Sequence, residues 1–167
     1  SFDIGPTLFR WFDHHAPQVG AAIVAADRAS AIRLGNGNAI AMPYHHVILP
    51  LASYRDKVTE VRWGIRDFRE RFGREPEGMW LPETAMDEES LAVLADEGIR
   101  FTVLAPHQVE NPPPFGRPGR WRDGHGRELA IFCYDGPLSH DIAFGALLKS
   151  AENWLQRMLD RPVADDG

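Results

Sequence analysis

The sequence comprises 167 residues, 44% of them hydrophobic, and its 18 Lys and Arg residues against 24 Asp and Glu residues give a net charge of −6. A chain of this length can bury a core, while its acidic balance argues against binding nucleic acid or an anionic membrane through a basic surface. The longest apolar stretch, residues 21–26, is far shorter than the roughly 20 residues that span a bilayer. The single cysteine, Cys133, excludes an internal disulfide and suits a reducing compartment. We therefore expect a cytoplasmic protein without nucleic-acid or membrane partners.

Proline and glycine residues divide the first half of the chain into short strands and longer helices. In chain order, the sequence predicts a strand end at Ser1–Gly5, helices at Pro6–His15 and Gln18–Leu34, a turn at Gly35–Asn38, a strand at Ala39–Met42 and a helix at Tyr54–Phe72. The last of these has the clearest pattern, because its apolar residues recur at spacings of three and four between an N-cap at Ser53 and a stop at Gly73. We expect the tryptophans on helices, Trp11, Trp63 and Trp154, to be packing residues.

The second half continues the alternation. It predicts a strand at Glu77–Pro82, a helix between Asp87 and Gly98, a strand at Phe101–Leu104, a Pro-, Gly- and Arg-rich excursion at Asn111–Gly126, a strand at Leu129–Tyr134, and helices at Ser139–Leu148 and Ala151–Asp160. Short apolar strands that alternate with helices are typical of parallel strands joined by crossovers and buried on both faces. The predicted fold class is α/β. Glycine-rich phosphate loops of the P-loop or Rossmann kind are absent from the sequence, so nucleotide binding lacks its usual support.

Polar side chains follow the carboxyl ends of the predicted strands, where parallel α/β folds gather their functional groups. The set comprises Tyr44, His45, His46, Glu83, Thr84, His107, Gln108, Asp135 and Ser139, with Trp80 one residue inside its strand end. Two carboxylates, an aromatic platform and polar groups for hydroxyls are what a glycosidase needs. Structural roles stay open for both acids, because Glu83 can belong to the next helical turn and Asp135 can cap the helix after it.

The adjacent histidines also allow a metal-site interpretation, since histidines with a carboxylate can hold zinc. The sequence has neither an H-x-E-x-H nor an H-E-x-x-H pattern, and adjacent residues of a strand point to opposite sides, so at most one of His45 and His46 faces a cavity. We expect no metal and no other cofactor.

Three segments match the patterns of one known family: Gly78–Ala85, Gly35–Ala41 together with Tyr44–His46, and Arg62–Gly73. On these the chain resembles glycoside hydrolase family 57, and within it a bacterial branch; the family contains amylases, glucanotransferases and branching enzymes that act on α-glucans. Gly78–Ala85 resembles the strand-end motif Trp-Leu-x-Glu, and this resemblance makes Glu83 the nucleophile. Gly35–Ala41 with Tyr44–His46 is similar to the motif that lines the donor sugar subsite, and Arg62–Gly73 is similar to the helix before the nucleophile strand.

The resemblance implies an incomplete seven-stranded (β/α) barrel and a retaining mechanism through a glycosyl-enzyme, which needs two carboxyl groups ~5–5.5 Å apart. The family's first motif, a strand with a substrate-contacting His, has no counterpart here. We therefore expect residues 1–167 to be the central part of a single catalytic barrel domain, a partial barrel truncated at both ends and inactive alone. The family's acid/base Asp is commonly followed by Gly and Glu, whereas Asp135 precedes Gly136 and Pro137, so the acid/base is Asp135 or an Asp beyond residue 167.

Together these observations predict a retaining hydrolase or transglycosylase of α-glucans, with Glu83 as nucleophile and an oligo- or polysaccharide as substrate. The predicted substrate-binding residues are Asn38, His45, His46, Trp80 and His107. Two alternatives stay open. One is a metal-dependent polysaccharide deacetylase with His45 or His46 and Asp135 as ligands, and the other is a glucan-binding protein without turnover.

Overall fold

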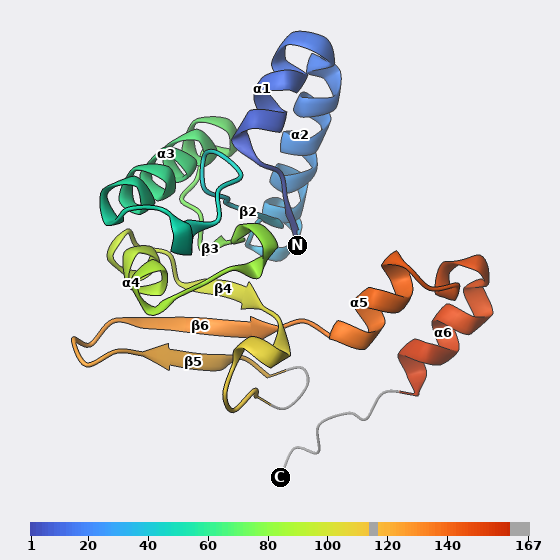
Figure 1. The fold of residues 1–167 in the computed structure, drawn as a ribbon. Coiled ribbons are helices and arrows are strands. Elements are labelled where there is room, and N and C mark those ends of the chain that lie inside the picture. The colour runs from blue at the N-terminus through green and yellow to red at the C-terminus, as the bar shows by residue number, and fades with distance from the viewer. Residues whose placement is uncertain (114–116, 161–167) are drawn as a thin grey trace.

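The structure, a computed structural model, describes residues 1–113 and 117–160 and is built around a parallel sheet (Figure 1). The parallel strands are β1 (Phe2–Asp3), β2 (Ala39–Ile40), β3 (Gly78–Met79), β4 (Phe101–Leu104) and β6 (Glu128–Cys133). β1 pairs with β2, and β3, β4 and β6 lie side by side, with a bridge between Ala41 and Met79 joining the two groups. The parallel strands thus follow one another across the sheet in chain order, and the α/β class is confirmed.

The strand β5 (Gly119–Arg122) corrects the interpretation of Asn111–Gly126 as an excursion outside the core fold, and also the expectation of parallel strands alone. β5 runs antiparallel along the outer edge of β6. The turn between them is held by Asp123, whose carboxylate accepts N–H bonds from His125 at 2.8 Å and from Arg127 at 3.0 Å. Trp121 lies on this hairpin and donates to Glu88 at 2.8 Å, so its indole is tied to a helix. Residues 114–116 of the excursion lie outside the described residues.

The helices α1 (Pro6–His15), α2 (Pro17–Leu34), α3 (Tyr54–Phe72) and α4 (Glu88–Asp96) confirm the predicted ones closely. The α3 N-cap forms as expected, with Ser53 accepting the Asp56 N–H at 3.3 Å, and Gly73 ends the helix at φ +67°. Asp87 caps α4 by accepting the Ser90 N–H at 2.7 Å. These ends are set by local chemistry, which explains why sequence patterns found them.

The expected packing of the helical tryptophans is wrong. Trp11 is 51% exposed, Trp63 52% and Trp154 40%. On α1 the buried ring is instead Phe9, which meets Phe72 of α3 edge-on at 5.7 Å. Helical spacing shows which residues share a face but not whether that face is covered.

The core lies between the sheet and the helices α3 and α4. It includes Val61, Ile65 and Phe68 of α3, Leu91 and Leu94 of α4, and Met79, Leu104 and Ile131 of the strands. α3 approaches the end of β2 closely at Gly64, where a Cβ atom would overlap the carbonyl oxygen of Met42. Glycine at this position therefore fixes the distance between α3 and the carboxyl end of β2.

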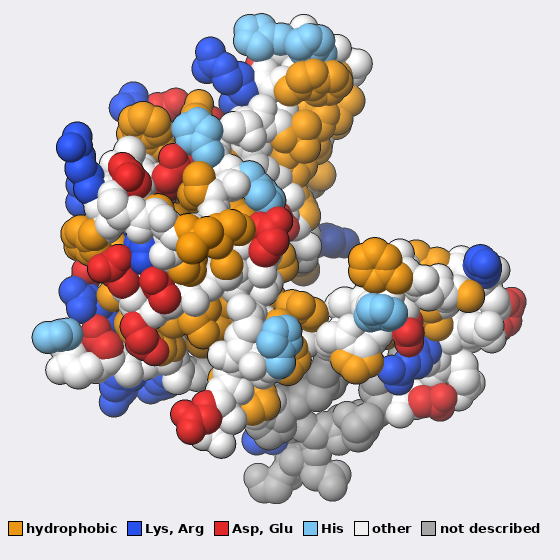
Figure 2. All heavy atoms as spheres, viewed as in Figure 1, with side chains coloured by type: hydrophobic (Ala, Val, Ile, Leu, Met, Phe, Trp, Pro, Cys, Tyr) orange, Lys and Arg blue, Asp and Glu red, His pale blue; other side chains and the backbone are white. Residues whose placement is uncertain are grey.

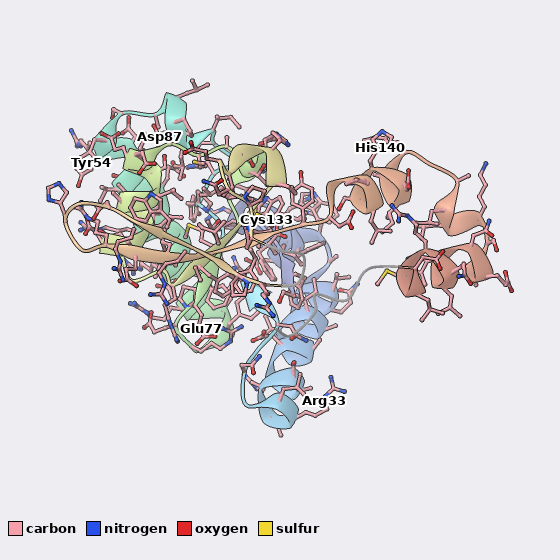
Figure 3. All side chains as sticks on the ribbon, turned by 90° about the horizontal axis from the view of Figure 1, so that it is seen from below. Arg33, Tyr54, Glu77, Asp87, Cys133 and His140 are labelled. Carbon is pink, nitrogen blue, oxygen red and sulfur yellow. The ribbon has the colours of Figure 1, made fainter. Side chains whose placement is uncertain are left out.

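The helices α5 (Gly136–Ala143) and α6 (Ala151–Leu159) form an arm, residues 136–159, that stands apart from the rest of the fold. Figure 3 shows the same separation from below, with the arm leaving the sheet beyond Cys133 and carrying His140. α5 begins three residues before the predicted start because Asp135 caps it, and it ends at Ala143 rather than Leu148. Every residue of both helices is at least partly exposed. Among the described helices, none is long and apolar enough to cross a membrane.

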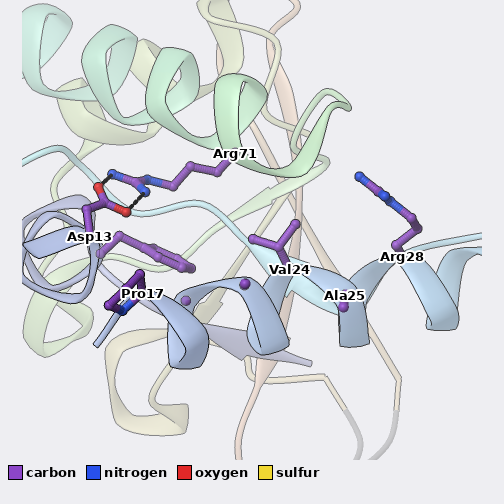
Figure 4. Close-up of a pocket in the computed structure, with 9 residues that line it drawn as sticks. Asp13, Pro17, Val24, Ala25, Arg28 and Arg71 are labelled. Atoms are coloured by element: carbon purple, nitrogen blue, oxygen red, sulfur yellow. Dashed lines mark hydrogen bonds and ion pairs between the residues drawn. The ribbon is translucent and has the colours of Figure 1, made fainter. Parts of the chain in front are cut away.

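A hollow of about 450 Å³ lies where α1 and α2 meet α3 (Figure 4). Its walls are mostly small apolar side chains, and at one end Arg71 donates to both carboxylate oxygens of Asp13, at 3.0 and 2.9 Å. This pair ties α1 to α3. The predicted site residues lie elsewhere, at the strand ends.

Candidate active site

Glu83 lies just beyond the carboxyl end of β3, in the short turn Pro82–Thr84. Leu81 and Pro82 are buried and anchor the turn, while the Glu83 side chain is 61% exposed at the edge of the sheet. Glu83 and Thr84 both have φ of +53°, in the left-handed region that residues other than glycine rarely adopt. Such conformations cost about 1–3 kcal/mol each and persist only where the surroundings enforce them.

Gln108 holds this strained turn from the neighbouring strand. Its amide donates to the Thr84 carbonyl at 2.7 Å and accepts the Ala105 N–H at 2.8 Å. Gln108 follows β4, so the bond joins the ends of adjacent strands. The Thr84 side chain is buried beneath the turn. Gln108 thus acts as a clamp that fixes the direction in which Glu83 projects.

His46 meets the Glu83 carboxylate from the other side. Its Nε2 lies 3.1 and 3.2 Å from the two carboxylate oxygens. His46 follows β2, the strand that bridges to β3, so two neighbouring strand ends bring the pair together. The predicted meeting of strand-end residues is therefore confirmed for His46 and Glu83. In the tautomer with hydrogen on Nε2, the ring donates to the carboxylate and steadies it.

His45 turns away from this pair and binds Glu60 on α3. The Glu60 carboxylate lies 2.8 Å from His45 Nδ1 and accepts the His45 backbone N–H at 2.8 Å, and the Glu60 carbonyl accepts the Tyr44 N–H at 3.0 Å. Only 14% of the Glu60 side chain is exposed. Glu60 anchors the loop that carries His46, a role that nothing in its helical sequence context signals.

A cavity of about 650 Å³, the central cavity, opens between the strand ends and α5. Its lining comprises Trp80, His107, Tyr134, Gly136, Ser139, His140, Ala143 and Phe144. The structure thus brings the predicted Trp80 and His107 together, and it adds His140 and Phe144, whose rings lie 5.4 Å apart. Figure 2 shows hydrophobic and histidine side chains on both sides of the hollow between the main body and the arm. Of the arm residues, the sequence analysis named Ser139 but missed His140 and Phe144, because α5 reaches this place only through the tertiary fold.

Asp135 has the capping role that the sequence allowed for it. Its Oδ1 accepts the Leu138 N–H at 2.7 Å at the start of α5. It lines a second hollow, of about 290 Å³, which shares Tyr134 with the central cavity. Asp135 therefore lies near the candidate site, and one of its carboxylate oxygens caps α5.

Asn38 does not join the other predicted site residues. It precedes β2, and its carbonyl accepts the Phe2 N–H at 2.9 Å, so it lies at the amino end of the sheet. Glu83 and His46 lie beyond carboxyl ends. Nearby, Asp27 and Arg74 fill the space beside Gly37, where a Cβ atom would overlap both side chains. This glycine segment packs against the Asp27–Arg74 ion pair, at the opposite end of the strands from Glu83.

The adjacent histidines His45 and His46 do not form a shared ligand set. Within residues 1–113 and 117–160, no group of three or more His, Cys, Asp or Glu side chains is placed to hold a metal ion. His45 and His46 bind different carboxylates, Glu60 and Glu83, so they do not converge on one point.

Parallel α/β folds gather their functional groups beyond the carboxyl ends of the strands, and Glu83, His46 and the central cavity lie at that edge. The sequence matches the family model described as glycosyl hydrolase family 57 over residues 29–163. The chain therefore belongs to glycosyl hydrolase family 57.

Individual relatives are distant and much longer. The chain is 24% identical to α-amylase 1 of Dictyoglomus thermophilum over 97 residues. This aligned segment covers 58% of this chain and 13% of the amylase. The 4-α-glucanotransferase of Thermococcus litoralis superposes with a TM-score of 0.71 at 18% identity, over 95% of this chain and 24% of that one. A protein of Mycobacterium smegmatis assigned as a polysaccharide deacetylase superposes with a TM-score of 0.60 at 18% identity, over 86% of this chain and 50% of that one. These superpositions show a shared fold.

Proposed function

We propose that the protein is a retaining glycoside hydrolase or transglycosylase acting on α-glucans, with Glu83 as its nucleophile. The observation that carries this proposal is the Glu83 carboxylate itself, held at a strand end by a strained turn and bonded to His46. Strain of this kind gathers at functional sites, where the surrounding structure maintains it. Membership of glycosyl hydrolase family 57 supports the reaction class.

The proposed reaction has two steps. Glu83 attacks the anomeric carbon while a second carboxyl group protonates the departing glycosidic oxygen, and a glycosyl-enzyme ester forms. That second group, now a carboxylate, then removes a proton from water or from an acceptor sugar hydroxyl, which attacks the anomeric carbon and frees Glu83. In our proposal the second group is Asp135 or an Asp outside residues 1–167.

Substrate would extend from the central cavity to Glu83, which follows the lining residue Trp80 by three positions but is not itself part of the lining. Trp80 and Tyr134 offer ring surfaces for the apolar faces of sugars, and His107 and His140 offer ring nitrogens for hydroxyls. His46 would keep one orientation of the Glu83 carboxylate during attack, which lowers the entropic cost of reaching the transition state. Asn38 and His45 have no contact role in this scheme, and His45 acts through the loop that it anchors.

The strand order supports a barrel architecture. Each parallel strand lies beside the preceding parallel strand, as in a (β/α) barrel, whereas doubly wound sheets reverse direction at a switch point. We therefore take the described sheet as an arc of an incomplete barrel, with residues 1–167 as its central part. The antiparallel β5 is an addition at one edge.

The test replaces Glu83 by Gln in the full-length protein and measures hydrolysis of a maltoside with a nitrophenol leaving group, which needs little acid assistance. Loss of the nucleophile should lower kcat by about a thousandfold or more. Glu75→Gln is the matched control, because the Glu75 side chain is similarly exposed, at 66%, and pairs with Arg69 on the surface. Unchanged hydrolysis by Glu83→Gln would refute the assignment.

The deacetylase alternative makes a different prediction in the same assay series. It requires a bound metal ion, so prolonged chelation would abolish turnover of an acetylated sugar and leave the maltoside inert throughout. Our proposal expects full maltoside hydrolysis after chelation.

A further inference from the structure

Another hollow, with an aromatic wall, lies where α3 meets α1 and the loop after β2, and it shares no lining residue with the central cavity. It measures about 480 Å³ and is lined by Arg10, Tyr44, Trp63, Arg66, Asp67 and Glu70, together with Arg71. We call it the Tyr44–Trp63 hollow. Figure 2 shows hydrophobic, basic and acidic side chains intermixed over α3. The proposed mechanism uses none of these side chains.

The two rings stand at right angles and form a corner. Their centroids are 5.7 Å apart with an interplanar angle of 85°, and the Trp63 side chain is half-exposed. The corner is preorganised from both sides. The neighbouring Gly64 sets α3 against Met42, and the Tyr44 N–H is bonded to the Glu60 carbonyl at 3.0 Å. A half-exposed indole held in place is a ready stacking platform.

The charges around the corner are paired among themselves. Arg66 donates to Glu70 at 2.8 Å, and Arg71 donates to Asp67 at 2.9 Å and to Asp13. Arg10 is the remaining lining cation, so the lining has three arginines and two carboxylates, and Asp13, outside the lining, balances the third charge by pairing with Arg71. Such a hollow has little net preference for an anion or a cation, but it offers many donors and acceptors. A neutral ligand that is rich in hydroxyl groups and has an apolar face fits this chemistry best.

The hollow is connected to the candidate active site through one loop. The Tyr44 ring meets the His45 ring at 4.9 Å, and the next residue, His46, binds Glu83. Ring contacts thus lead from Trp63 through Tyr44 to His45, which precedes His46 in the same loop.

We propose that the Tyr44–Trp63 hollow is a secondary binding site for an α-glucan chain. A glucose ring stacks its C–H face on Trp63 against the edge formed by Tyr44, and hydroxyls bond to the Arg66, Asp67 and Glu70 side chains. This inference rests on the proposed function for the identity of the sugar. The site adds affinity for long glucans and leaves short substrates, which reach only the central cavity, unaffected.

The test measures the retardation of the full-length protein in native gels containing amylopectin, in the Glu83→Gln background so that the polymer is not consumed. Adding Trp63→Ala should weaken the apparent affinity by on the order of tenfold, as for other aromatic anchors. Trp63→Phe, which keeps a ring, should retain part of the retardation. Trp11→Ala is the matched control, because Trp11 is equally exposed but stacks on His15 of α1. Circular dichroism and thermal melting establish that each variant is folded.

The outcomes separate this inference from the proposed function. Retardation that is the same with and without Trp63, or absent in every variant, overturns the inference even if the wild-type protein hydrolyses maltosides. If retardation depends on Trp63 but the wild-type protein, with Glu83 intact, does not turn over glucans, the binding site is supported and the proposed function is overturned. If Trp63→Ala is unfolded, Trp63→Phe and Arg66→Ala carry the test, and unchanged retardation by both overturns the inference.

Discussion

The clamp between Gln108 and the Glu83 turn leads to a prediction about activity and stability together. Gln108→Leu keeps the size of the side chain but removes the bonds to the Thr84 carbonyl and the Ala105 N–H, at 2.7 and 2.8 Å. With about 1 kcal/mol for each bond, the free energy of unfolding should fall by about 2 kcal/mol. The strained φ angles of Glu83 and Thr84 lose their support and should relax.

Relaxation of this turn would move the Glu83 carboxylate, and a displacement of about 1 Å can cost about 100-fold in rate. We therefore expect kcat for an activated maltoside to fall by about 100-fold in folded Gln108→Leu, with a much smaller change in KM. Urea unfolding gives the stability and steady-state kinetics on the folded protein give the rate. Gln18→Leu, at an exposed position of α2, is the control and should change neither. A variant that loses stability but keeps the wild-type kcat would show that the clamp does not position Glu83.

Two further predictions concern carboxylates. Asp135→Asn keeps a good N-cap for α5, so the variant should melt at the same temperature as the wild type. If Asp135 is the acid/base, the variant's kcat on a natural glucan should fall by about 100-fold or more, while its hydrolysis of a nitrophenyl maltoside is kept. An equal loss of activity on both substrates would contradict that role. Burial works to raise the pKa of Asp27, but the Arg74 guanidinium and the Ala39 N–H outweigh it and hold this pKa below its usual value. A lowered pKa in the folded state stabilises the protein above the unfolded pKa of about 3.9, and this contribution is lost as the pH falls through the folded pKa. Asp27→Asn should therefore lower the free energy of unfolding by about 3 kcal/mol at pH 7, and by less in acid, as measured by urea unfolding. A loss of stability that does not change with pH would refute the pairing.

The parts of the fold that the sequence predicted are those set by neighbouring residues. Ser53, Asp87 and Gly73 act within one turn of their helices, so the ends of α3 and α4 follow from local chemistry. β5 could not be found this way, because its pairing with β6 depends on a turn and on contacts across strands. The exposure of Trp63 was also hidden, since a helical face is covered or open only according to what packs against it.

The candidate site shows the same division. The rule that functional groups follow strand ends correctly predicted that His46 and Glu83 meet. The same rule would have excluded Asn38, because Asn38 precedes its strand. Glu60 and Gln108 act through other residues, and such roles depend on three-dimensional contacts that no local pattern encodes.

The geometry around Glu83 indicates why the proposed nucleophile needs support from three directions. Two consecutive residues in the left-handed region cost several kcal/mol in sum, by the usual range of about 1–3 kcal/mol each, and would relax in an unsupported turn. Support comes from the bonded Gln108, from the buried Thr84 side chain, and from His46 on a loop that Glu60 anchors. Because each comes from a different element, loss of one should shift the carboxylate without unfolding the domain. The strand ends therefore set the position of Glu83, while Glu60 and Gln108 set its orientation.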